Sequence, residues 1–141
     1  MENKFIVIGL ILLSFILFNC KGKNQSMNNI YDGPEALKWL KENKNQFAFA
    51  SNHFNSTNEA IEFVNLLYSS GAKEVKISGE TIRDDKNTIT MEGGPYADGL
   101  VVILPSDKST ANMILEICRK ESDPGYDKPQ IENNMIFLWW D

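Results

Sequence analysis

The chain has 141 residues, of which 43% are hydrophobic and 23% charged, and its formal net charge is −5. This length suits one domain, and an acidic chain without a basic cluster is a poor nucleic-acid binder, because neutralising phosphates requires grouped Lys and Arg. Two cysteines and one histidine exclude a disulfide-rich scaffold and the usual zinc ligand sets.

The first residues have the pattern of an export signal. A short polar start carries Lys4, and Phe5 to Phe18 then form a run of fourteen residues without a charge. As a helix this run would extend roughly 21 Å, at about 1.5 Å per residue. That is short for the ~30 Å hydrocarbon core of a bilayer and suits the apolar region of a signal peptide.

Leu17-Phe18-Asn19-Cys20 resembles the lipobox of bacterial lipoproteins, in which an aliphatic residue stands three positions before a cysteine. The resemblance implies a diacylglyceryl group on the Cys20 thiol, cleavage before Cys20, and acylation of the new N-terminus by a chain such as palmitate. It also implies that the protein is anchored to a membrane of the bacterial cell envelope, at the periplasmic face or the cell surface. Two or more acyl chains hold a protein stably on a membrane. The alternatives are an uncleaved N-terminal anchor and a secretory signal cut at another position.

We therefore divide the chain into a signal peptide (1–19), a lipidated flexible tether (20–30) and a single α+β domain (31–141). Removing the signal leaves 122 of the 141 residues, enough to bury about two-thirds of the unfolded surface without a metal or disulfide. Because Cys20 carries lipid in this interpretation, Cys118 has no disulfide partner. From Met27 onward there are 11 Lys and Arg against 18 Asp and Glu, a net charge of −7, which favours solubility and repels an anionic membrane surface.

The first half of the domain predicts two helices and a strand. Pro34 is well placed to open a short amphipathic helix over 34–44. Phe47-Ala48-Phe49-Ala50 is a compact apolar run that predicts a strand. Ser56 and Glu59 have the spacing of a capping box and start a longer helix, which Gly71 is expected to end.

The second half predicts strands separated by one more helix. Glu74–Ser78 and Thr88–Met91 both alternate polar and apolar residues around a turn at 84–87, so 74–91 predicts a hairpin-like excursion. Leu100–Leu104 is continuously aliphatic, which is typical of a strand buried on both faces. A helix capped by Ser106 or Asp107 follows, and Met135–Trp140 predicts a final strand that is apolar on both faces.

These elements have the order β-α-β-(β)-β-α-β after a short N-terminal helix. This order predicts an α+β fold, the ferredoxin-like split β-α-β sandwich, in which two helices cover one face of the sheet. The strands at 100–104 and 135–140 are apolar on both faces, so something must cover the second face. The helix at 34–44 is our candidate, and a partner protein is the alternative.

Four residues are candidates for a binding site. Tyr96 and Asp98 lie in the glycine-rich loop 93–99, and His53 is the only histidine. Trp140 is the member of the final indole pair that an interaction surface would expose, and the alternative is that both indoles pack in the core. The loop leads into a strand and not into a helix, so it does not predict a phosphate cradle. The acids lack the spacing of a calcium loop and no catalytic constellation is evident, so we expect neither a cofactor nor a metal.

The sequence thus predicts a membrane-anchored lipoprotein whose domain binds a protein partner or a small ligand. One alternative is an inhibitor or immunity-type protein that attracts a basic partner electrostatically. The other is a hydrolase that uses His53 with an acid from the region of Asp98. The expected partners are the membrane, through the lipid on Cys20, and a protein, but not nucleic acid.

Overall fold

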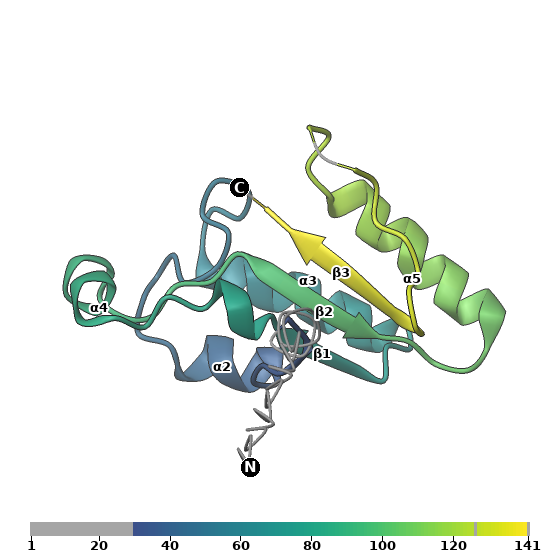
Figure 1. Ribbon diagram of the computed structural model, residues 1–141, viewed down its shortest axis with the longest axis horizontal. Helices are drawn as coiled ribbons and strands as arrows, with labels where there is room; N and C mark the ends of the chain where they lie inside the picture. Colours follow the sequence, from purple (N-terminus) through teal and green to yellow (C-terminus); the bar gives the residue numbers. More distant parts are fainter. Residues whose placement is uncertain (1–29, 126, 141) are drawn as a thin grey trace, which may run out of the picture.

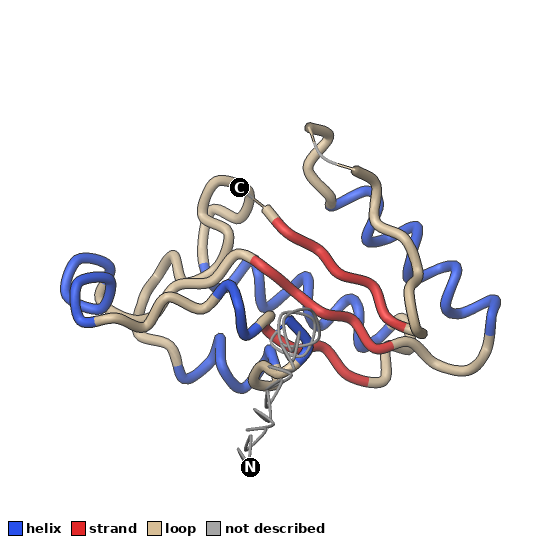
Figure 2. The backbone as a smooth tube through the Cα atoms, in the orientation of Figure 1, coloured by secondary structure: helices blue, strands red, loops and turns tan. Residues whose placement is uncertain are grey.

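The computed structural model describes residues 30–125 and 127–140, so the signal peptide, Cys20 and nearly all of the tether lie outside the described residues. The described part is an α+β domain with four α-helices and a three-stranded antiparallel sheet (Figures 1 and 2). The elements in chain order are α2 Ala36–Glu42, α3 Thr57–Ser69, β1 Glu74–Ile77, a 3-10 helix Gly79–Thr81, α4 Lys86–Glu92, β2 Gly99–Ile103, α5 Lys108–Glu121 and β3 Met135–Trp139.

The sheet has the order β1-β2-β3, with β2 at its centre. Val102 of β2 lies opposite Val75 of β1 and Ile136 of β3. Because side chains alternate along a strand, this register gives the sheet two distinct faces. The inner face carries Val75, Ile77, Leu100, Val102, Ile136 and Leu138, and the outer face carries Glu74, Lys76, Gly99, Val101, Ile103, Met135, Phe137 and Trp139.

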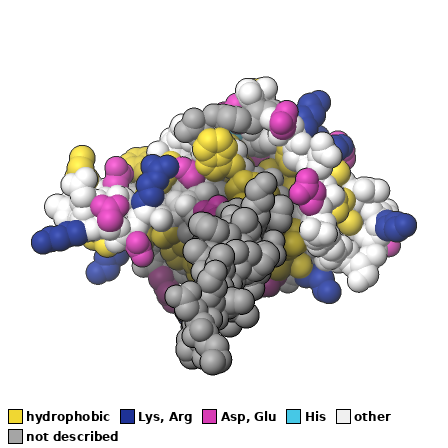
Figure 3. All heavy atoms as spheres, in the orientation of Figure 1, with side chains coloured by type: hydrophobic (Ala, Val, Ile, Leu, Met, Phe, Trp, Pro, Cys, Tyr) yellow, Lys and Arg dark blue, Asp and Glu magenta, His cyan; other side chains and the backbone are white. Residues whose placement is uncertain are grey.

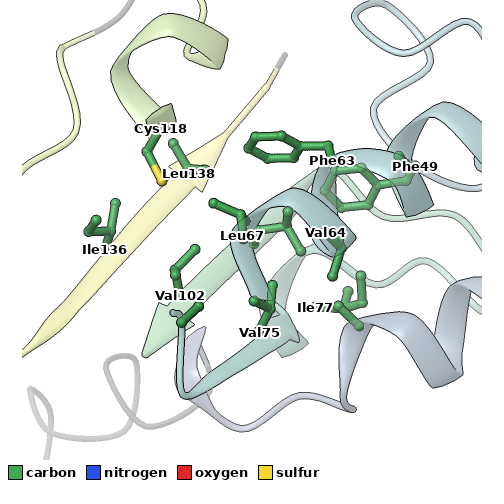
Figure 4. Close-up of a cluster of buried hydrophobic side chains, with 14 of the residues drawn as sticks. Phe49, Phe63, Val64, Leu67, Val75, Ile77, Val102, Cys118, Ile136 and Leu138 are labelled. Atoms are coloured by element: carbon green, nitrogen blue, oxygen red, sulfur yellow. The ribbon is translucent and has the colours of Figure 1, made fainter. Parts of the chain in front are cut away.

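The inner face forms one hydrophobic core with three helices. Side chains of α3 and α5, including Leu67 and Cys118, pack against it (Figure 4). Leu40 of α2 belongs to the same core, so the prediction that the helix at 34–44 covers the second face is wrong. The reason is that β1 has a free edge, where Ile77 N–H donates to Pro34 O at 3.0 Å. This bond holds the start of α2 beside the inner face.

The helices predicted from capping signals are present. Ser56 Oγ accepts from the N–H of Glu59 at 3.2 Å at the start of α3, and Asp107 accepts from the N–H of Thr110 at 2.8 Å at the start of α5. Gly71, just after α3, has a φ of 104°, the left-handed conformation expected of a residue that ends a helix. The carboxylate of Glu59 accepts from the N–H of Asn55 at 2.7 Å, one residue before the position that a capping box predicts.

Two predicted strands are not found. The segment 47–50 makes a single parallel bridge, between Phe49 and Ala97, because β2 and β3 pair directly with each other along their lengths. Residues 88–91 belong to helix α4, not to a hairpin strand. Asp85 accepts from the N–H groups of Asn87 and Thr88, and Gly93 ends the helix with a φ of 80°, so the two caps outweigh the alternating pattern.

A partly buried series of hydrogen bonds ties α2, α3 and β1 together. Tyr68 Oη donates to Glu35 Oε1 at 2.7 Å and accepts from the N–H of Val75 at 3.0 Å. Burial alone would raise the pKa of Glu35, but the Tyr68 hydroxyl and the N–H groups of Lys38 and Leu37 hold it below 4.5. Burial, followed by the bond to Glu35, raises the pKa of Tyr68 to about 12.

The hydrogen bonds of Tyr68 and Glu35 predict how the stability of the fold changes with mutation and with pH. Tyr68→Phe removes the acceptor of Val75 N–H, so we expect the free energy of unfolding in urea to fall by about 1–2 kcal/mol.

The pKa of Glu35 is lowered in the folded state, so the contribution of Glu35 to stability is present above pH 4.5 and is lost as the pH falls through the folded value. Urea unfolding of the native protein and of Glu35→Gln measures this, and an equal deficit at neutral and acidic pH would contradict it.

Candidate functional site

The structure brings the four predicted site residues to one end of the sheet. Trp140 N–H donates to Asp98 O at 3.0 Å, which joins the end of β3 to the segment before β2. The loop that carries His53 is joined to the same place, because Ala50 N–H donates to Ala97 O at 2.9 Å and His53 N–H donates to Ala50 O at 2.8 Å. Three segments distant in sequence therefore meet here.

The backbone of Ala50 is strained at the place where these three segments join. Its φ is 39° and its side chain is buried. A residue other than glycine in this region carries conformational strain, which persists only where surrounding contacts impose it. The bridge between Phe49 and Ala97 supplies such contacts, so the loop leaves the sheet along a defined path.

Arg83, which sequence reasoning missed, connects Tyr96 with Asp98. Arg83 Nη2 lies 2.7 Å from Asp98 Oδ2, and the Asp98 side chain is almost completely buried. The same guanidinium lies 5.2 Å from the centre of the Tyr96 ring, within the range of a cation–π contact. Arg83 and Tyr96 also exchange both backbone hydrogen bonds, at 2.7 and 3.0 Å. This pairing brings Arg83 beside Asp98, and it leaves no local pattern in the sequence that could have identified Arg83.

A shallow polar depression lies beside this group. Its volume is about 270 Å³, and it is lined by Ser51, Arg83, Thr88, Glu92 and Tyr96. Tyr96 Oη accepts from the N–H of Ser51 at 3.3 Å. The lining offers a guanidinium, a carboxylate and hydroxyl groups, so it can form hydrogen bonds with a small polar group. Its small volume is below the range of typical small-molecule sites.

His53 pairs with a carboxylate other than the one expected. Its Nε2 lies 3.0 Å from Glu121 Oε2, whereas the hydrolase alternative requires a pairing with an acid near Asp98. The imidazole stacks on Trp140 at 5.7 Å between ring centres, and Trp140 Nε1 donates to Glu121 O at 2.9 Å. A general base in hydrolysis needs a nucleophile within hydrogen-bond reach, and in the described residues no hydroxyl or thiol is hydrogen-bonded to His53. The pair therefore joins the 51–54 loop to α5.

The exposed indole is Trp139 and not Trp140. Trp140 is 1% exposed and packs edge-on against Phe49 and Phe54, whereas Trp139 is 41% exposed. Trp140 continues the inner-face alternation of Ile136 and Leu138, so its side chain points into the core. The prediction that Trp140 belongs to an exposed interaction surface is corrected by this geometry.

A second candidate surface is formed by α4 and the groove beside it. Figures 1 and 2 show α4 at the tip of the segment between β1 and β2, which extends away from the sheet. None of its residues is buried, and Met91 and Ile89 are 74% and 44% exposed. Beside it is a groove of about 340 Å³ whose lining includes Trp39, Ile89 and Pro95. Asn43 Nδ2 donates to Pro95 O at 2.9 Å, which attaches the returning leg of the excursion to the end of α2.

Neither cysteine contributes to a site in the described residues. Cys20 lies outside them, and Cys118 is a free, buried thiol whose pKa is raised to about 12 by burial. Within residues 30–125 and 127–140, no group of three or more His, Cys, Asp or Glu side chains could hold a metal ion. In the same ranges, no helix has the length and apolar character needed to cross a membrane.

Comparison of the chain with protein-family models, with curated proteins and with solved structures found no match.

The contact between Arg83 and Asp98 predicts a measurable difference between two arginines. Arg83→Met removes the cation beside a buried carboxylate, so we expect the free energy of unfolding to fall by about 1–3 kcal/mol. Arg119→Met is the comparison, because its ion pair with Glu116 is exposed and such pairs contribute about 0–1 kcal/mol; it also loses a long bond from Arg119 Nε to Pro129 O, at 3.3 Å. Chemical denaturation compares the two variants, and an equal loss in both would contradict the assignment.

Proposed function

We propose that this chain is a lipid-anchored protein of the bacterial cell envelope whose α+β domain binds a protein partner through α4 and the adjacent groove. The apolar run and the lipobox-like residues before Cys20 support the anchor. The observation that carries the binding role is that α4 buries none of its residues while it exposes Met91 and Ile89.

The form of α4 supports a protein partner over a small ligand. Isolated helices of this length are only marginally stable in water, and α4 contributes nothing to the core. Its fold is held locally by Asp85, whose pKa is lowered by hydrogen bonds from the Thr88 side chain and backbone. Methionine side chains adapt to varied apolar surfaces, and the groove lined by Trp39, Ile89 and Pro95 can accept an apolar side chain from the partner.

The inhibitor alternative draws less support from the distribution of charge. On the face drawn in Figure 3, acidic side chains are interspersed with Lys and Arg and do not gather into one acidic surface. A partner attracted chiefly by long-range electrostatics would require a region of a single sign. The apolar groups around α4 are the better basis for recognition.

We also propose a more specific strand arrangement within the α+β class. A ferredoxin-like origin is supported by the chain order of 47–50, α3, β1, β2, α5 and β3, whereas the parallel bridge of Phe49 with Ala97 departs from that fold, in which neighbouring strands are antiparallel. The direct pairing of β2 with β3 departs from the ferredoxin-like strand order. We therefore propose a variant in which the first strand is reduced to a short segment at the end of the sheet.

Mass spectrometry of the protein isolated from membranes tests the anchor. We expect a mature chain that begins at Cys20 and carries a diacylglyceryl group and an N-terminal acyl chain. Cys20→Ala is the control, and it should accumulate unprocessed and without lipid. A mature protein with an unmodified Cys20, or one that begins at Met1, would refute the anchor.

Photo-crosslinking in intact cells tests the binding surface. A photoreactive amino acid in place of Met91 is expected to give a discrete protein adduct, and Ile89→Ser in the same chain should reduce its yield several-fold. Met113 on α5 is the matched control site, since it is also an exposed methionine and lies outside the surface. Equal adducts at both positions, or none at 91, would count against the proposal.

A further inference from the structure

The outer face of the sheet carries two exposed aromatic side chains on β3. Phe137 and Trp139 project from it and are 38% and 41% exposed. Phe137 lies opposite Val101, which is itself fully buried, and Met135 extends the same row of outward side chains along β3.

The described chain begins on this same face. Tyr31 lines a depression of about 300 Å³ together with Pro129, Met135 and Phe137. Ten peptide units connect Cys20 to Ile30, and such a length spans at most about 35 Å in any conformation. A lipid on Cys20 would therefore keep the bilayer within that distance of the outer face.

The chemistry of the face suits the headgroup region of a bilayer. Tyrosine, tryptophan and phenylalanine combine apolar rings with, in the first two, a polar group, and they favour the boundary between lipid and water. Glu74 and Lys76, which lie on the same face, form an ion pair at 3.7 Å, so their charges offset each other. The depression beside Phe137 also includes Asp127, Lys128 and Glu132 in its lining, so the face suits zwitterionic headgroups better than anionic ones.

We propose that the outer face rests on the lipid bilayer, with Phe137 and Trp139 inserted at its headgroup boundary. This inference depends on the lipid anchor proposed above. The bound acyl chains hold the domain at the surface, and the aromatic side chains then fix its orientation. The α3 helix, on the other side of the sheet (Figure 1), faces water in this arrangement.

Spin labels on introduced cysteines test the orientation in the lipidated mature protein. Met135→Cys places a label on the outer face and leaves both aromatic side chains in place, and Leu66→Cys places one on the exposed side of α3. The native thiols do not compete, because Cys118 is buried with a pKa of about 12 and Cys20 carries lipid. The protein is reconstituted in phosphatidylcholine vesicles, and collisions with oxygen and with a water-soluble nickel chelate are compared.

The expected result is a several-fold higher ratio of oxygen to nickel collisions at position 135 than at position 66. Phe137→Ser with Trp139→Ser should lower the ratio at 135 to that at 66, and an unchanged label mobility at 66 confirms that the fold is retained. Equal ratios at both positions in the native chain would overturn the inference. Dipolar broadening between labels at 135, without oxygen contact, would overturn it in favour of an interface between two copies.

Vesicle flotation separates this outcome from a failure of the anchor. A protein that floats with the vesicles but has equal collision ratios retains the anchor and refutes the docking of the outer face. A protein that does not float, and whose Cys20 accepts the spin label, refutes the anchor and with it the inference that depends on it.

Discussion

Burial of the inner face of the sheet is the constraint on which the other surfaces of this domain depend. Leu138 and Trp140 of the last strand segment pack into the core together with side chains of α3 and α5. Because side chains alternate along the strand, the same register turns Phe137 and Trp139 outward. A shift of one residue would exchange these two sets, so the exposed aromatic surface follows directly from the packing of the core.

The domain presents two apolar surfaces in different places. The outer face lies over the sheet near the start of the described chain, whereas α4 stands at the end of the domain opposite α5 (Figure 1). A sheet that rests on lipid leaves α4 free at the side of the domain. Membrane orientation and partner binding are therefore compatible, because Phe137 and Met91 belong to surfaces that do not overlap.

The accuracy of the sequence predictions depended on whether local signals agreed. The helices that begin after Ser56 and Asp107 were predicted because the capping residue and the spacing of the apolar residues both indicate a helix. The prediction failed at 88–91, where alternation of Thr, Ile and Met favoured a strand while Asp85 and Gly93 cap a helix. It also failed at 47–50, because an apolar run of four residues specifies burial but does not specify a pairing partner.

The sequence by itself predicted an export-type start, and it determined the acidic composition, the α+β class and the positions of the main helices, since these depend on composition and on contacts between near neighbours. Only the tertiary structure decided which side chains meet. His53 and Glu121 are 68 residues apart, and Arg83 reaches Asp98 through the pairing of the excursion's two legs. Neither contact leaves a local pattern, because each is created by packing distant segments around one core. The same packing selected Trp139 as the exposed indole and buried Trp140.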